Sequence, residues 1–104
     1  MNREELLGKV KQAVHEIEPG AKIILYGSRS REDSTSGSDW DFLILVDGPV
    51  TDQRTDRIRH RLYEIEWEFG EVLSSIVQNR RKWNSFPYRA MPFHEKVKNE
   101  GTLL

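Results

Sequence analysis

The sequence contains no cysteine among its 104 residues. Disulfide bonds, thiolate catalysis and cysteine-based zinc sites are therefore excluded, and the absence fits a reducing compartment. No apolar run approaches the roughly 20 residues that a helix needs to cross a bilayer. The charged N-terminal stretch also lacks the apolar segment of a signal peptide. We therefore expect a cytoplasmic protein without a membrane partner.

The sequence also lacks a strong excess of charge of either sign. Sixteen lysines and arginines oppose seventeen aspartates and glutamates, which leaves a net charge of −1. Bulk electrostatics then gives no drive toward nucleic acid. Two basic runs, residues 54–61 and 80–82, either form a local RNA-binding patch or lie on solvated helix faces beside acidic partners. We favour solvated faces, so nucleic acid is not an expected partner.

Apolar spacing and turn residues predict one domain over residues 1–104 with alternating helices and strands. The expected elements are a helix over 2–17, a strand over 22–26, a short helix from 28 to about 35, a strand over 40–46, a helix over 51–69, a strand over 72–77 and a helix over 89–99. This alternation predicts an α/β layer fold.

Polar residues with a distinctive order separate the first two predicted strands. Gly27 directly follows a strand, where glycine permits a positive φ and a close backbone approach. Ser28 stands where a helix begins, a place that suits an anion. Arg29 and Arg31 occupy a first turn that normally prefers acidic residues. Basic residues in this first turn are explained if a bound phosphate supplies the negative charge. Gly27, Ser28, Arg29 and Arg31 are therefore candidates for nucleotide binding.

Asp39 and Asp41 stand two residues apart at the start of the second strand, and alternate strand residues share a face. Two neighbouring carboxylates repel each other unless a cation lies between them. Mg²⁺ takes oxygen ligands, often one or two carboxylates completed by substrate phosphates and water. Phosphate donors and magnesium ligands at opposite ends of one loop predict a nucleoside triphosphate site.

The order Gly27-Ser28, ten residues, Asp39-x-Asp41 resembles the signature of the minimal nucleotidyltransferases of the DNA polymerase β-like superfamily. The final stretch, FHEKVKNEGTLL, resembles the closing helix and ending of that family. The resemblance implies a small mixed β-sheet with helices packed on it, an α+β variant of the predicted class. It also implies transfer of a nucleoside monophosphate, AMP in the first instance, from an NTP to an acceptor hydroxyl.

The resemblance assigns roles by position. Gly27 and Ser28 hold the β- and γ-phosphates, and Asp39 and Asp41 are catalytic and ligate one or two Mg²⁺ ions. The acceptor is expected on a partner protein such as a HEPN-type toxin, in a toxin–antitoxin pair, or the site is completed in a homo-oligomer.

One departure from the family pattern concerns the third carboxylate, expected on the next strand. Ser75 stands where we expect that acid, and Glu71 is a further candidate for a metal ligand if the strand register differs. The alternative function is therefore a catalytically weakened module that binds nucleotide or its partner. A nucleic-acid binder that uses the basic runs is a third and weaker alternative.

Overall fold

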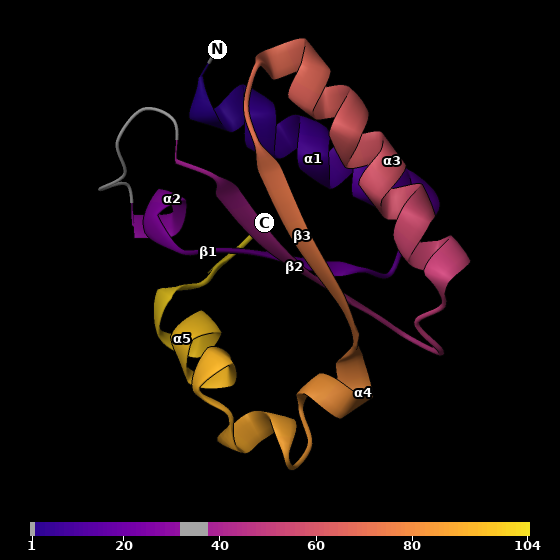
Figure 1. Cartoon of the computed structure of the whole chain (residues 1–104), viewed down its shortest axis with the longest axis vertical. Coiled ribbons are helices and arrows are strands. Elements are labelled where there is room, and N and C mark those ends of the chain that lie inside the picture. The colour runs from indigo at the N-terminus through magenta and orange to yellow at the C-terminus, as the bar shows by residue number, and fades with distance from the viewer. Residues whose placement is uncertain (1, 32–37) are drawn as a thin grey trace.

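The computed structural model describes residues 2–31 and 38–104 (Figure 1). Their helices and strands are, in chain order, α1 (Arg3–Ile17), β1 (Lys22–Tyr26), α2 (Ser28–Arg31), β2 (Trp40–Val46), α3 (Asp52–Phe69), β3 (Leu73–Asn79), α4 (Arg80–Trp83), the 3-10 turn η1 (Tyr88–Ala90), α5 (Pro92–Glu100) and β4 (Thr102–Leu103). The part of the predicted short helix beyond residue 31 lies outside the described residues.

The four strands form one mixed sheet in the order β3-β2-β1-β4. β1 pairs antiparallel with β2 and with β4, whereas β2 and β3 run parallel. The long helix α3 makes the crossover between the two parallel strands, which need such a connection. The predicted α/β class with a small mixed sheet is confirmed.

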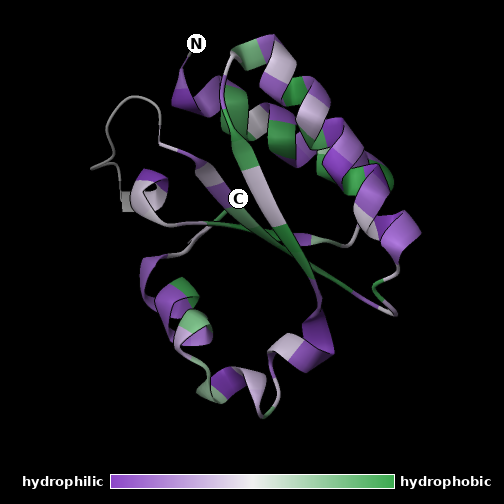
Figure 2. Cartoon of the chain, in the orientation of Figure 1, coloured by the Kyte–Doolittle hydropathy of each residue, from purple (hydrophilic) through white to green (hydrophobic). Residues whose placement is uncertain are grey.

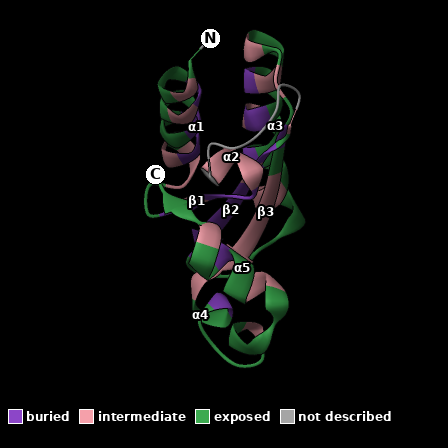
Figure 3. Ribbon diagram, turned by 90° about the vertical axis from the view of Figure 1, so that its left-hand side faces the viewer, coloured by how far each residue is buried: buried purple, intermediate pink, exposed green. Residues whose placement is uncertain are grey.

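Helices cover both faces of this sheet, and in Figure 3 α1 and α3 lie on one side of the strands with α4 and α5 on the other. Along β2, Phe42 and Ile44 belong to the core beneath α1 and α3, whereas Leu43 and Leu45 pack with residues of α4 and α5. Figure 2 shows the resulting hydrophobic centre of the sheet against largely hydrophilic outer helix surfaces. The nearly continuous apolar sequence of β2 is thus explained by burial on both sides.

The two long helices begin and end where capping chemistry predicts. The side chain of Asn2 accepts a hydrogen bond from the Glu5 amide at 2.7 Å, and that of Thr51 accepts one from the Arg54 amide at 3.1 Å. Gly70 ends α3 in the left-handed region, at φ 67°. These local rules explain why both helices match their predicted bounds closely.

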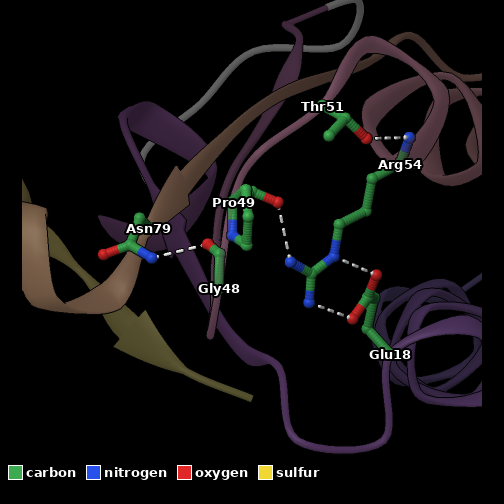
Figure 4. Close-up of polar contacts among 6 residues, drawn as sticks. All are labelled: Glu18, Gly48, Pro49, Thr51, Arg54 and Asn79. Carbon is green, nitrogen blue, oxygen red and sulfur yellow. Dashed lines mark hydrogen bonds and ion pairs between the residues drawn. The ribbon is translucent and has the colours of Figure 1, made fainter.

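Polar side chains fasten the far end of the sheet, at the turn after β2 (Figure 4). Arg54 donates to both carboxylate oxygens of Glu18, at 2.6 and 2.8 Å, and to the carbonyl of Pro49 at 3.0 Å. Asn79 donates to the carbonyl of Gly48 at 2.6 Å. The Glu18–Arg54 pair therefore ties the end of α1 to the start of α3.

The C-terminal third departs most from the sequence prediction. β3 spans Leu73–Asn79 rather than 72–77, the last helix spans Pro92–Glu100 rather than 89–99, and α4 and β4 were not predicted. The side chain of Asn79 accepts a hydrogen bond from the Lys82 amide at 3.0 Å and so caps α4 directly after the strand. β4 exists only because it pairs with β1, a long-range contact that leaves no periodic pattern.

Candidate functional site

Gly27 and Asp41 form the centre of the candidate site. Gly27 follows β1 at φ 78°, and a Cβ built on it would lie 2.7 Å from Oδ2 of Asp41. Asp41 stands on β2 opposite Tyr26, the last residue of β1. The glycine therefore serves both the turn and the close approach of the carboxylate, as the sequence predicted for this position.

The turn that follows is held by the C-terminal segment. The hydroxyl of Ser30 donates to the carbonyl of Glu100 at 2.5 Å and lies 2.8 Å from the hydroxyl of Thr102. Gly101, between them, packs so tightly that a Cβ there would lie 2.5 Å from the carbonyl of Val97. The half-buried Ser28 is the first residue of this turn and directly follows Gly27.

Asp39 and Asp41 interact electrostatically, as their spacing predicted. Burial raises the pKa of Asp41, the charge of Asp39 raises it further, and Lys96 opposes both effects. Asp39 is exposed and Asp41 is half-buried. Burial, and then the charge of Asp41, also raises the pKa of Tyr26. The pair carries unfavourable negative charge that a bound cation would relieve.

Lys96 is the residue that sequence reasoning missed. It lies on α5, and its charge acts on Asp41 although 55 positions separate the two in the sequence. The only available signal was its place in the closing stretch, one turn before Glu100-Gly101. A lone lysine on an amphipathic helix is ordinarily a solvated side chain, so only the docking of α5 beside β1 shows its relation to Asp41.

The two arginines differ in what the structure shows. Arg29 is engaged within the chain: its Nε donates to the carbonyl of Ser38 at 3.1 Å, and it forms an ion pair with Glu71 at 3.6 Å. Arg31 ends α2, and its side chain lies outside what the structure describes. The geometry thus brings Gly27, Ser28, Asp39 and Asp41 to one end of the sheet, and it gives Arg29 protein partners.

The strand register corrects the expected position of the third acid. Asp41 pairs with Ser74, whereas Ser75 pairs with Phe42 and faces the α1 and α3 side of the sheet. The exposed Ser74 therefore occupies the place beside Asp41 that we had given to Ser75. The prediction was wrong by one residue because Leu73 pairs with Trp40, which sets Ser74 beside Asp41, and a shift of one residue in register reverses the face of every side chain.

Glu71 lies before β3 rather than on it. Its carboxylate accepts a hydrogen bond from Nε1 of Trp40 at 3.3 Å and pairs with Arg29, on the side of β2 opposite Asp41. Among residues 2–31 and 38–104, no three histidines or acidic residues lie together as a metal site. Asp39 and Asp41 still fit a magnesium ion, because two carboxylates suffice where substrate phosphates and water complete the shell.

A comparison with protein-family models gives a match to the nucleotidyltransferase domain over residues 7–98. The chain belongs to the nucleotidyltransferase family. The matched range contains every candidate site residue, from Gly27 to Lys96. The resemblance stated from the Gly-Ser and Asp-x-Asp pattern is thereby confirmed at the level of the family.

This nucleotidyltransferase domain is also similar to a solved structure, spectinomycin adenyltransferase AAD(9) from Enterococcus faecialis with ATP and spectinomycin. The TM-score is 0.67 at 21% sequence identity, over 84% of this chain and 37% of the other. The likeness establishes the fold, and this chain spans little more than a third of that protein. A search of curated proteins found no match.

Other surfaces of the nucleotidyltransferase domain lie apart from the site. A cavity of about 610 Å³ is lined by Ile17, Gln53, Asp56, Arg57, His60 and Arg61. Two arginines of the first basic run are paired, Arg54 with Glu18 and Arg61 with Glu16 and Glu64, which supports a solvated helix face. Across the described ranges, no helix has the length and apolar character needed to cross a membrane.

Proposed function

We propose that this domain transfers a nucleoside monophosphate, AMP from ATP, to a hydroxyl group of an acceptor. A bond forms between the acceptor oxygen and the α-phosphorus, the bond from that phosphorus to the β-phosphate oxygen breaks, and pyrophosphate leaves. The observation that carries the proposal is the packing of the Gly27 turn against Asp41, since it places the start of α2 directly beside one of the two paired carboxylates. Family membership supports the reaction class.

One group of residues would contact the phosphates and another would bind the metal. Gly27 lets the triphosphate approach the backbone, Ser28 offers hydrogen-bond donors, and Arg31 is a further phosphate contact. Asp39 and Asp41 would hold one or two Mg²⁺ ions. When bound, the metal would neutralise charge on the α-phosphate and lower the pKa of the attacking hydroxyl.

Lys96 would act from the other side of the site. It already opposes the rise in the pKa of Asp41, so it contributes positive potential where the triphosphate charge would lie. An ammonium group on a flexible stem is well suited to follow a phosphate that leaves. Charge neutralisation by Lys96 and by the metal is the kind of electrostatic stabilisation on which phosphoryl transfer depends.

The acceptor is proposed to belong to a cytoplasmic protein partner, a HEPN-type toxin in a toxin–antitoxin pair, or to a second copy of the chain. Three large apolar side chains, two in the C-terminal half of α3 and one just before β3, support an interaction surface. Trp67 is 74% exposed, and Tyr63 and Val72 are each 54% exposed. Tyr63 and Trp67 stack edge-to-face, with ring centroids 6.2 Å apart. Such aromatic groups are enriched where proteins meet.

The second candidate function is a nucleotide-binding or partner-binding module with weakened catalysis. Ser74 favours it, because a serine beside Asp41 supplies neither charge nor a general base. Nucleotide binding would survive this loss better than turnover, since two carboxylates and the phosphates can still hold a magnesium ion.

Incubation with ATP carrying a labelled α-phosphate, Mg²⁺ and a HEPN-type protein tests the first proposal. We expect label on the partner with the wild type and none with the double variant Asp39→Ala, Asp41→Ala. Equal label transfer by the wild type and the double variant would contradict the proposal. Calorimetry with ATP and Mg²⁺ separates the two candidates, because binding without transfer points to the module.

A further inference from the structure

Arg29 makes three contacts that leave its side chain only 15% exposed. Its Nε donates to the carbonyl oxygen of Ser38 at 3.1 Å, and its Nη2 lies 3.6 Å from a carboxylate oxygen of Glu71. Its guanidinium carbon lies 4.5 Å from the centre of the Trp40 ring, well within cation–π range. The guanidinium therefore has polar partners at its edge and an aromatic ring against its face.

Glu71 completes the arrangement from the segment between α3 and β3. The carboxylate oxygen that pairs with Arg29 also accepts a hydrogen bond from Nε1 of Trp40 at 3.3 Å. The backbone nearby is fastened as well, since the amide of Trp40 donates to the carbonyl of Val72 at 2.9 Å. Glu71 is 80% buried by its side chain, so water competes only partly for these contacts.

The contacts converge on the two neighbours of one residue. Ser38 and Trp40 flank Asp39 in the sequence, and Arg29 holds the first by its carbonyl and the second by its ring. Asp39 itself is exposed, so its own packing does little to fix the direction of its carboxylate. Its orientation depends on the peptide units on either side, which the Arg29–Glu71 pair holds.

We propose that Arg29 and Glu71 are positioning residues that orient Asp39 toward the metal, and that Arg29 is not a phosphate ligand. The inference rests on the proposed function, because it concerns the carboxylate pair of that site. Binding geometry must be held to about 0.5 Å for a metal or catalytic group to work, and a supporting shell of this kind provides it. Glu71 thus acts on the metal site through Arg29 and Trp40 rather than as a ligand.

The proposal is tested by Mn²⁺ titration of the full chain without nucleotide, followed by electron paramagnetic resonance of the free ion. We expect Glu71→Gln and Arg29→Lys each to weaken Mn²⁺ binding by roughly tenfold or more, in the range seen for outer-shell partners of metal ligands. Lysine keeps the charge but lacks the planar fork that reaches Ser38 and Glu71 together. Glu68→Gln is the matched control: Glu68 is 54% exposed and meets Lys9 only at 4.0 Å.

Each outcome decides between the roles. Folded variants that bind Mn²⁺ like the wild type, yet bind ATP less well, would overturn the positioning role and make Arg29 a phosphate ligand. Thermal melting identifies a variant that does not fold, and the other variant then carries the test. A wild type that binds Mn²⁺ but transfers no nucleotide overturns only the proposed function. A wild type that does not bind Mn²⁺ overturns the positioning role itself.

Discussion

Gly27 and Asp41 are in steric contact: a Cβ on Gly27 would lie 2.7 Å from Oδ2 of Asp41. The contact couples the turn after β1 to the carboxylate on β2, so a single methyl group is expected to disturb both. Because Gly27 also has φ 78°, two separate costs attach to any side chain there. The first prediction separates them.

Gly27→Ala should destabilise the fold by about 1–2 kcal/mol through its left-handed backbone. Displacement of the Asp41 carboxylate from its rotamer should add about 0.5–1.5 kcal/mol. Urea denaturation measures the sum. Gly70→Ala is the control for the backbone cost alone, since Gly70 has φ 67° and nothing within 4 Å of a Cβ. In an Asp41→Ala background the displacement cost should vanish, and equal losses for Gly27→Ala in both backgrounds would contradict the steric argument.

Asp41→Asn should make the unliganded protein more stable at neutral pH. A raised folded pKa means that stability from this group is complete below the unfolded pKa of about 3.9 and is lost as pH rises through the folded value. The asparagine variant escapes that loss, so its advantage in Tm should grow with pH. It should reach a few degrees, since about 1 kcal/mol corresponds to 4–8 °C in a small domain.

Added Mg²⁺ should reverse the comparison, because it stabilises only the protein that binds it. Melting curves across the acidic and neutral range, with and without Mg²⁺, provide the measurement. A Tm difference that does not change with pH would show that burial of an ionised Asp41 has no energetic consequence.

Ser74→Asp should strengthen Mn²⁺ binding by roughly tenfold, because it adds a third carboxylate beside Asp41. Ser75→Asp is the matched control one residue away. Ser75 faces α1 and α3, so an acid there should leave Mn²⁺ binding unchanged and cost about 1–3 kcal/mol of stability. If Ser75→Asp strengthened Mn²⁺ binding and Ser74→Asp left it unchanged, the register of β3 in solution would differ from the one described.

Glu18→Gln should cost about 1 kcal/mol at neutral pH, because it removes a charge-assisted, two-point contact with Arg54. The hydrogen bond from Arg54 holds the pKa of Glu18 below its usual value. The wild-type advantage is therefore present above about pH 4.3 and is lost as pH falls through the lowered pKa. Glu16→Gln, at a position 54% exposed and paired with Arg61 at 3.2 Å, should change the free energy of unfolding little. Equal losses for both variants would contradict the prediction.

Local features of the sequence were enough to predict most helices and strands and the two central residues of the site, Gly27 and Asp41. The strand over 40–46 and the helix caps at Asn2 and Thr51 follow from patterns within a few residues of each other. Gly27 and Asp41 were identified because strand ends, glycine and paired carboxylates are all visible in one short stretch. Their contact then follows from the antiparallel pairing of β1 with β2.

The features that were missed depend on contacts between distant residues. The carboxylate of Glu66 accepts a hydrogen bond from the Leu73 amide at 2.7 Å, and the Trp40 amide donates to the Val72 carbonyl at 2.9 Å, which together fix where β3 begins and how it pairs with β2. That starting point decides between Ser74 and Ser75, and no local pattern contains it. The relation of Lys96 to Asp41 likewise depends on how α5 docks on the sheet.

The Ser30–Glu100 hydrogen bond joins residues 70 positions apart. A loop of that size closes only after residue 100 is available, and contacts of such high sequence separation form late and slowly in folding. During synthesis, the turn after Gly27 would leave the ribosome long before the segment that secures it. The turn after Gly27 should therefore become secured abruptly, once residue 100 has been synthesised, and a nascent chain that stops before residue 100 should carry both aspartates beside a turn that lacks its Ser30–Glu100 hydrogen bond.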